Sequence, residues 1–399
     1  MAPKTNHPVL GARALNRATL DRQLLLRPSP RGVFEAVEHL LGLQAQNTKP
    51  PYYALAARLE GFRPEQLSTL MESRAVARIV TMRSTVHTHT AGDAVALRRL
   101  VQPGAIDREL ALFVSRGGLD GVDLDRLAAT ARALVEERPR TPKQLREELL
   151  PLWPDADPQS LSVAARCLLP LVQVTPRGLW GRGGQVALTT TGQWFGAPDP
   201  DASATDQRPD ASATDQRPAA STADQTSEDP ADLDRTVLRY LGAFGPASVK
   251  DMQTWCGLTK LGPAFERLRS RLLVFQDERG TELFDLPDAP RPDEDTPAPP
   301  RFLPEFDNLL LSHADRTRVV PADLRGRTWT GNQAHRVFLL DGFLGGIWHL
   351  DEAKDRTTLT IEPFVPVSRA QRASLAAEAE RTLRLMTPSD IPYEIVHGQ

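Results

Sequence analysis

Two neighbouring glutamines are the side chains of this sequence best suited to chemistry. Residues 40–47 read LLGLQAQN, so that Gln44 and Gln46 follow a leucine-rich stretch with only Ala45 between them. An amide offers one acceptor and two donors, so it can orient a water or a hydroxyl, but it is a poor base. On a regular helix residues i and i+2 point about 200° apart. We therefore predict that the helix ends or distorts between Gly42 and Gln46, which lets both side chains face one cleft.

A structural role for the same pair is the alternative interpretation. If both glutamines lie on a regular buried helix and bond backbone groups with their amides, they form a cap or a polar edge of the core. The residues alone leave the two interpretations open.

A second polar pattern occurs in TMRSTVHTHT, where Arg83, Thr85, His87 and His89 alternate along one face of a predicted strand. Two histidines could begin a metal site, but no third ligand follows at a suitable spacing, so we expect no metal. The pattern favours a polar strand face, with contact of Arg83 and His87 to DNA as a further option. No phosphate-binding loop, zinc pattern or dinucleotide motif occurs elsewhere, and we expect no cofactor.

Composition places the chain among soluble globular proteins. It has 399 residues, a formal net charge of −3 and two cysteines, Cys167 and Cys256, which we interpret as reduced thiols. The start has no apolar signal core and no run is long enough for a membrane span, so we expect a cytoplasmic, nucleoid-associated protein. Residues 1–195 carry 25 Lys and Arg against 18 Asp and Glu, a basic surplus compatible with phosphate recognition.

The order of elements predicts an α+β fold of three winged-helix-like units in tandem, followed by a β-rich module with a covering helix. The repeat DASATDQRP at 201–209 and 210–218 has no Leu, Ile, Val or aromatic residue, which indicates a disordered linker. The predicted division is winged-helix units at 1–102 and 103–196, an acidic linker at 197–230, a third winged-helix unit at 231–290 and the β-rich module at 301–399.

Winged helices commonly place one helix in the major groove of DNA, with the wing touching the backbone. Candidate contacts are Arg177 and Arg182 beside the second wing, and Lys260 and Arg267 on the third recognition-type helix. Each of these residues could equally be a solvated surface charge. Winged helices bind DNA without catalysis in transcription regulators, and they also bind proteins. A transcription regulator and a protein–protein adaptor therefore remain alternatives.

Four segments resemble the AlkZ/YcaQ group of winged-helix DNA glycosylases. They are LGLQAQN, MRSTVHTHTAGDA, LPEFDNLLLSHADRTRVV and VFLLDGFLGGIWHL. The resemblance implies monofunctional excision of N7-alkylated purines and, in the AlkZ branch, unhooking of interstrand crosslinks. It also implies catalytic roles for Gln44 and Gln46, and Gln46 places the chain nearer AlkZ because the YcaQ branch has Asp there.

The expected partner is therefore double-stranded DNA with alkylated or crosslinked purines. We expect the protein to bind it as a monomer. The expected role is DNA repair or self-resistance to a genotoxin. N7-alkylation makes the base cationic, so it is already an activated leaving group. We assign Gln44 and Gln46 to positioning a water and orienting the transition state, rather than to proton abstraction.

Overall fold

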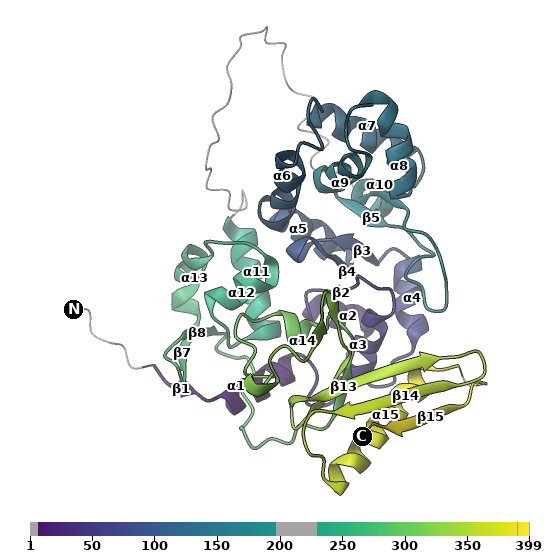
Figure 1. Cartoon of the computed structure of the whole chain (residues 1–399). Coiled ribbons are helices and arrows are strands. Elements are labelled where there is room, and N and C mark those ends of the chain that lie inside the picture. Colours follow the sequence, from purple (N-terminus) through teal and green to yellow (C-terminus); the bar gives the residue numbers. More distant parts are fainter. Residues whose placement is uncertain (1–6, 197–229, 389, 399) are drawn as a thin grey trace.

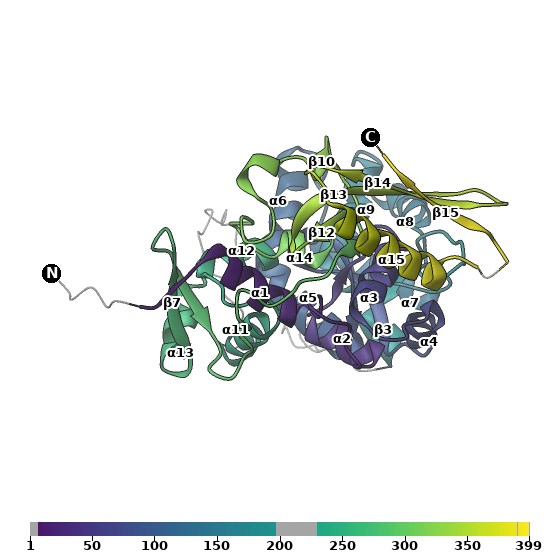
Figure 2. The ribbon, with the colours of Figure 1, turned by 90° about the horizontal axis from the view of Figure 1, so that it is seen from below.

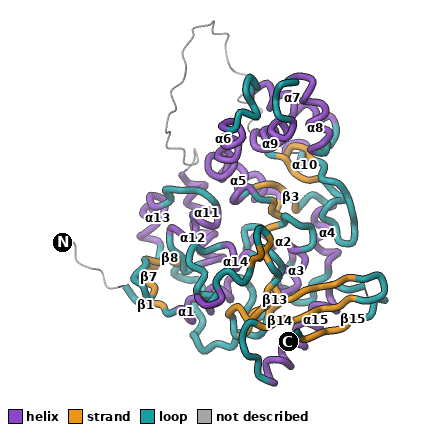
Figure 3. Tube along the Cα trace, viewed as in Figure 1, coloured by secondary structure: helices purple, strands orange, loops and turns teal. Residues whose placement is uncertain are grey.

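The structure, a computed structural model, describes residues 7–196, 230–388 and 390–398. It has a mixed α+β fold (Figure 1). Figure 3 shows the long strands gathered in the C-terminal part, whereas the region of α5–α10 is mainly helical. The predicted linker and its repeat lie outside the described residues except for Pro230, which begins a helix. None of the helices in the described ranges is long and apolar enough to cross a membrane.

The N-terminal part is built around a five-stranded sheet in the order β2-β4-β3-β5-β6. Its first elements are β1 (Val9–Leu10), α1 (Ala12–Arg22), α2 (Val33–His39), β2 (Leu43–Gln44), α3 (Pro50–Arg58), α4 (Pro64–Glu72), β3 (Val76–Val80), the short 3-10 turn η1 (Met82–Ser84), β4 (Val86–Thr90) and α5 (Ala91–Val101). They continue with the π-helical turn η2 (Gln102–Ile106), α6 (Asp107–Ser115), α7 (Leu124–Glu137), α8 (Pro142–Leu149), η3 (Leu150–Leu152), α9 (Pro158–Leu168), β5 (Leu171–Gln173), β6 (Leu188–Thr190) and α10 (Thr191–Phe195).

This sheet crosses the division predicted at residue 102. β3 pairs antiparallel with β5, so Arg78 lies opposite Gln173 and Ile79 lies opposite Val172. The hairpins of the first two predicted units therefore share one hydrogen-bonded sheet, which fixes the Gln44 segment relative to the loop between β5 and β6.

The third region has the element order helix, helix, helix, hairpin. It comprises α11 (Pro230–Phe244), α12 (Val249–Cys256), α13 (Gly262–Leu268), η4 (Arg269–Arg271), β7 (Leu273–Asp277) and β8 (Glu282–Asp285). The N-terminal strand β1 adds to this hairpin by pairing in parallel with β7 (Figure 2). Arg22 at the end of α1 and Asp285 at the end of β8 form a buried ion pair of 2.5 Å. The start of the chain is thus packed against the third region.

The C-terminal part is a sheet in the order β15-β14-β13-β12-β9, with α15 packed against it (Figure 2). Its elements are β9 (Arg301–Leu303), α14 (Asn308–Leu311), η5 (Ala322–Leu324), β10 (Trp329–Thr330), β11 (Gln333–Ala334), β12 (Val337–Leu340), β13 (Phe343–Glu352), β14 (Thr357–Pro363), α15 (Arg369–Met386) and β15 (Tyr393–His397). Trp348 of this sheet and Tyr53 of α3 belong to one buried cluster, and Arg58 and Asp307 form a fully buried ion pair of 2.8 Å. These contacts join the sheet to the part that carries the glutamines.

The helix before the glutamines ends at His39, as the spacing of Gln44 and Gln46 predicted. Leu41 has φ 55° and Gly42 has φ 90°, a left-handed turn that redirects the chain into β2. A Cβ on residue 42 would lie 2.2 Å from Nδ1 of His89, so the turn needs glycine for its close approach as well as for its φ. β2 then pairs with β4, placing Gln44 opposite His87.

Gly42→Ala should therefore destabilise the protein much more than a glycine change where there is free space. We expect the free energy of unfolding to fall by at least about 3 kcal/mol, because strain at φ 90° adds to the clash with His89. Gly121→Ala is the matched control, since Gly121 has φ 73° and nothing lies within 4 Å of its added Cβ. That change should cost only about 1 kcal/mol in urea unfolding. Equal costs would show that the approach to His89 carries no strain.

Candidate active site

Gln44 and Gln46 lie on the same side of an extended segment. Gln44 ends β2, and the backbone N–H of Ala45 donates to the carbonyl of Val86 at 2.7 Å, which continues the pairing with β4. Successive side chains of an extended chain alternate, so Leu43 and Ala45 enter the core while the glutamines point the other way. Gln44 is 7% exposed and Gln46 is exposed. The interpretation of the pair as part of a regular buried helix is therefore wrong.

Arg83 fixes the orientation of the Gln44 amide. Its Nη2 donates to Oε1 of Gln44 at 2.8 Å, while its Nη1 donates to the backbone carbonyl of Trp255 at the end of α12. A guanidinium has only donors, so the oxygen of Gln44 must face it and the NH₂ group must point away. Burial lowers the pKa of Arg83 to about 10, well above neutral, so the guanidinium keeps its charge.

The turn that presents Arg83 is strained. Arg83 and Ser84 both have φ 56°, a left-handed conformation that costs a residue with a side chain roughly 1–2 kcal/mol. The Ser84 hydroxyl donates to the Glu109 carboxylate on α6, and Arg83 binds α12. Contacts from two further helices thus hold the turn in the conformation that brings Arg83 to Gln44.

The two histidines of β4 form an uncharged, buried support for Arg83. Their rings stack with centroids 5.5 Å apart. Nδ1 of His87 donates to the carbonyl of Thr85 at 2.9 Å, so its Nε2 is the acceptor and lies 3.5 Å from Nη2 of Arg83. Burial lowers the pKa of His87 well below its usual value and that of His89 to about 4. Both rings are neutral near pH 7.

The segment is also held through its backbone and through Gln46. Arg78 on β3 donates from Nη2 to the carbonyl of Ala45 at 2.6 Å, and Oε1 of Gln46 accepts from the N–H of Val86 at 3.3 Å. Burial, together with the charge of Arg177, lowers the pKa of Arg78 to about 10. Arg78 was missed in the sequence, although a charge inside the apolar run VARIV is a signal of a special role.

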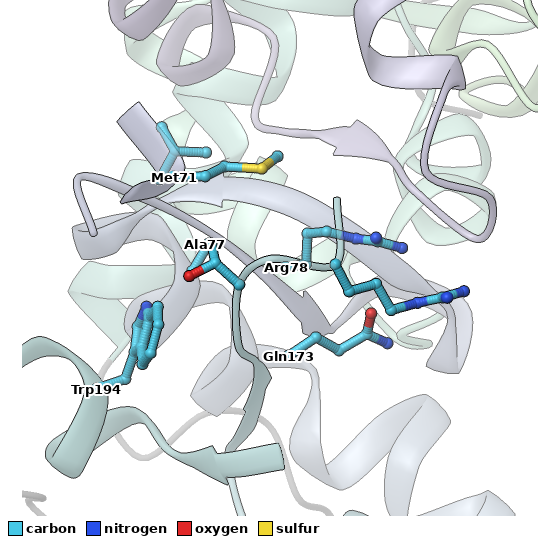
Figure 4. Close-up of a pocket in the computed structure, with 8 residues that line it drawn as sticks. Met71, Ala77, Arg78, Gln173 and Trp194 are labelled. Carbon is cyan, nitrogen blue, oxygen red and sulfur yellow. The ribbon is translucent and has the colours of Figure 1, made fainter. Parts of the chain in front are cut away.

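A small cavity lies on the other side of Arg78. It has a volume of about 10 Å³ and is lined by Met71, Val76, Ala77, Arg78, Gln173, Thr175, Arg177 and Trp194 (Figure 4). That space suits a single water at most and is far too small for a purine. Neither Gln44 nor Gln46 lines this cavity.

Within the described residues, neither glutamine amide hydrogen-bonds a carboxylate. A nearby carboxylate, Glu305, accepts from Asn47 at 3.1 Å and from Arg336 at 3.0 Å, so its charge is already paired. In the same part of the chain no group of three or more His, Cys, Asp or Glu side chains could hold a metal ion. The site can orient a water and polar atoms, but it offers no strong base in contact with the glutamines.

The residues predicted to touch DNA are scattered and differ in their availability. Arg182 is exposed, and Nη1 of Arg177 donates to the carbonyl of Gly184 at 2.9 Å within the β5–β6 loop. Arg267 on α13 is ion-paired with Asp234 of α11 at 2.6 Å. Lys260 lies in the loop between α12 and α13, so its predicted place on a helix is wrong; its φ of 58° explains why the helix cannot continue through it.

The predicted strand face from Arg83 to His89 is wrong at its start, because left-handed residues at 83 and 84 place Arg83 in a turn before β4; Arg83 and His87 both face inward. His87 is 1% exposed, and Arg83 is partly buried with both terminal nitrogens bonded inside the protein. Direct DNA contact by either residue stays a prediction that these placements do not favour.

The profile of the AlkZ-like DNA glycosylase family matches residues 37–385, which include the glutamine segment and the C-terminal sheet. The chain belongs to this family. It is therefore a DNA glycosylase of DNA repair, which decides against the regulator and the adaptor. Among solved structures, the DNA glycosylase AlkZ of Streptomyces sahachiroi has a similar fold, with a TM-score of 0.74, 18% sequence identity, and coverage of 97% of this chain and 100% of that chain. Comparison with curated proteins gave no match.

Arg83→Met should slow base excision by about 10- to 100-fold, because the Gln44 amide loses the contact that fixes its orientation. DNA affinity should stay close to that of the wild type, and Arg83→Lys should restore part of the rate. Single-turnover excision and a DNA-binding titration measure the two quantities, with Arg235→Met on α11 as the control. Weakened binding with an unchanged rate would instead make Arg83 a DNA contact.

Acidification should destabilise the protein between about pH 6.5 and pH 4. The pKa values of His89 and His313 are lowered by burial to about 4, so below pH 6.5 the unfolded chain binds protons that the folded protein cannot. His89→Gln should reduce the slope of unfolding free energy against pH by up to about 1.4 kcal/mol per pH unit in this window. Urea unfolding from pH 4 to 8 tests this, with exposed His349→Gln as the control. Identical slopes for His89→Gln and the wild type would contradict it.

Proposed function

We propose that this glycosylase excises N7-alkylated purines, including bulky or interstrand-crosslinked lesions, by hydrolysis of the N-glycosidic bond. The observation that carries the proposal is the uncharged glutamine pair, to which no carboxylate of the described part of the chain is bonded. Such a site suits a substrate whose leaving group is activated beforehand. An N7-alkylpurine meets this condition because its ring already carries a positive charge.

The reaction needs little proton transfer from the protein. The bond between C1′ and N9 breaks, its electron pair neutralises the cationic purine, and oxocarbenium character develops on the sugar. The oxygen of a water forms the new bond to C1′, and its proton passes to solvent. Each glutamine oxygen accepts one bond inside the protein and keeps a second lone pair, while its NH₂ group remains a donor. Gln44 and Gln46 can therefore hold this water and the sugar in line.

A bulky lesion also has to reach the glutamines. Gln46 is exposed, and Gln44, which is 7% exposed, lies next to it on the same side of the chain, so the pair is approached from the surface at Gln46. This placement supports attack on a modified base without its transfer into a deep pocket. The proposed biological role is repair or self-resistance to a genotoxin that alkylates DNA.

We extend the proposal to the architecture and the partner. The division into winged-helix units at 1–102, 103–196 and 231–290 is supported for the last unit by its three helices followed by a hairpin. Arg177, Arg182, Lys260 and Arg267 are proposed to contact the DNA backbone, and Arg182 is the most available of them because it is exposed. The enzyme is proposed to act as a monomer at the nucleoid.

The direct test incubates the protein with duplexes that carry one N7-methylguanine, one azinomycin-type crosslink or no lesion. The proposal predicts release of the modified base, an abasic site that breaks only after alkali, and no release from the unmodified duplex. Absence of release from both lesions, under conditions where another glycosylase acts, would overturn the proposed function.

Gln44→Ala and Gln46→Ala should each slow this release by about 10- to 100-fold, because the water loses one of its two supports. Binding to the duplex should change little. Gln44→Glu should stay in place through an ion pair with Arg83 and retain more activity than Gln44→Ala, since a carboxylate stabilises the developing positive charge. Gln193→Ala, an exposed glutamine of α10, is the control. Unchanged rates in both alanine variants would reject the assigned roles.

A further inference from the structure

Arg316 is a partly buried arginine in the loop that follows α14. Within the described residues its guanidinium makes no hydrogen bond and no ion pair, although Asp315 precedes it in the sequence. The carboxylate of Asp315 instead binds Arg279 at 2.7 Å and accepts from the N–H of Thr317 at 2.9 Å. Asp315 therefore pairs with Arg279 and not with its sequence neighbour Arg316.

The backbone contacts of this loop place it beside the glutamine site. The N–H of Ala314 donates at 2.8 Å to Asp251 on α12, and Trp255, one turn further along α12, accepts from Arg83. At the start of α14, which precedes this loop, Asn308 donates to the carbonyl of Gly42 at 2.7 Å. The segment from 308 to 316 thus runs from the turn before Gln44 to the helix that holds Arg83.

The side chains of Arg316 and Arg325 form a positively charged cluster, and neither is ion-paired with a carboxylate of the described residues. Burial lowers the pKa of Arg316, and the charge of Arg325 lowers it further. Arg316 in turn is among the charges that lower the pKa of Arg83. The nearby acids are occupied, because Asp251 faces Arg318 at 3.8 Å and Asp315 binds Arg279. The exposed Arg325 follows η5 and widens the cluster toward solvent.

Two arginines of the core show how a buried guanidinium is neutralised, whereas Arg78 and Arg83 bind carbonyl or amide oxygens and no carboxylate. Arg22 is paired with Asp285 and Arg58 with Asp307, both inside the core. An arginine that loses hydration without an anion is unfavourable, so the Arg316 cluster is suited to an anion from outside. A DNA glycosylase meets phosphate groups on its substrate, and the planar guanidinium fork matches their oxygens.

We propose that Arg316, assisted by Arg325, binds a backbone phosphate of DNA next to the lesion nucleotide, with Arg83 linking this phosphate site to Gln44. The inference rests on the proposed function for the position of the lesion at Gln44. It goes beyond that function by assigning a phosphate to named residues outside the predicted wings. This phosphate sets the position of the lesion relative to the glutamines, whereas contacts at the wings set the overall orientation on DNA.

The test measures binding to a duplex with a tetrahydrofuran abasic analogue, so it needs no excision and stays informative even if N7-methylguanine is not a substrate. Arg316→Met should weaken binding about 10-fold at roughly 0.1 M salt and lower the slope of log affinity against log salt by about 1. Arg316→Lys should keep the slope, which shows that charge and not folding is responsible. Arg369→Met at the start of α15 is the charge-matched control and should behave as the wild type.

A series of duplexes with single methylphosphonate linkages then locates the phosphate. One neutral linkage beside the abasic analogue should weaken the wild type about 10-fold and leave Arg316→Met unaffected, because the contact is already lost. The proposal is overturned if Arg316→Met keeps the wild-type salt slope, or if every methylphosphonate affects the two proteins equally. If the wild type binds the abasic duplex but releases no base from the alkylated duplexes, the result would count against the proposed function alone.

Discussion

The hydrogen bond from Arg83 to Gln44 is the interaction on which the rest of the site depends. It turns a freely rotating amide into a group with a fixed oxygen and a fixed NH₂ direction. The same guanidinium binds the carbonyl of Trp255, so the orientation of Gln44 depends on the docking of α12 against the N-terminal sheet. Parts of the chain that are far apart in sequence thus act on one side chain.

The fold supplies the means to maintain this contact. The left-handed turn at Arg83 and Ser84 is unfavourable by itself and persists because α6 and α12 bind both side chains. The approach of Gly42 to His89 brings β2 against β4 with no room for a side chain. Arg78 adds a bond to the carbonyl of Ala45. The uncharged glutamines are therefore positioned by charged and strained groups behind them.

Local features of the site could be predicted from the sequence. The i, i+2 spacing of Gln44 and Gln46 required the helix to break, and α2 does end at His39 before a left-handed glycine. The strand over Val86–Thr90 follows from its alternating residues, whereas the predicted strand face does not extend back to Arg83, which lies in a left-handed turn. These features depend on neighbours in the chain, and their signals are contained in short windows.

Long-range features could not be predicted in this way. Nothing local to Arg83 shows that its guanidinium turns inward to Gln44, because its partners lie on α12 and β2. The pairing of β3 with β5 and of β1 with β7 depends on tertiary contacts. The ion pair of Asp315 with Arg279 does so as well. Lys260 is a local miss, because Gly257 before it and Gly262-Pro263 after it are signals against a helix through this position.

A double-mutant cycle between Arg83 and Gln44 tests the central claim most directly. Single-turnover excision is measured for the wild type, Arg83→Met, Gln44→Ala and the double variant on one alkylated duplex. If Arg83 acts through Gln44, the double variant should be about as slow as Gln44→Ala alone, since the orienting contact has no amide left to orient. Multiplication of the two single effects in the double variant would contradict the account.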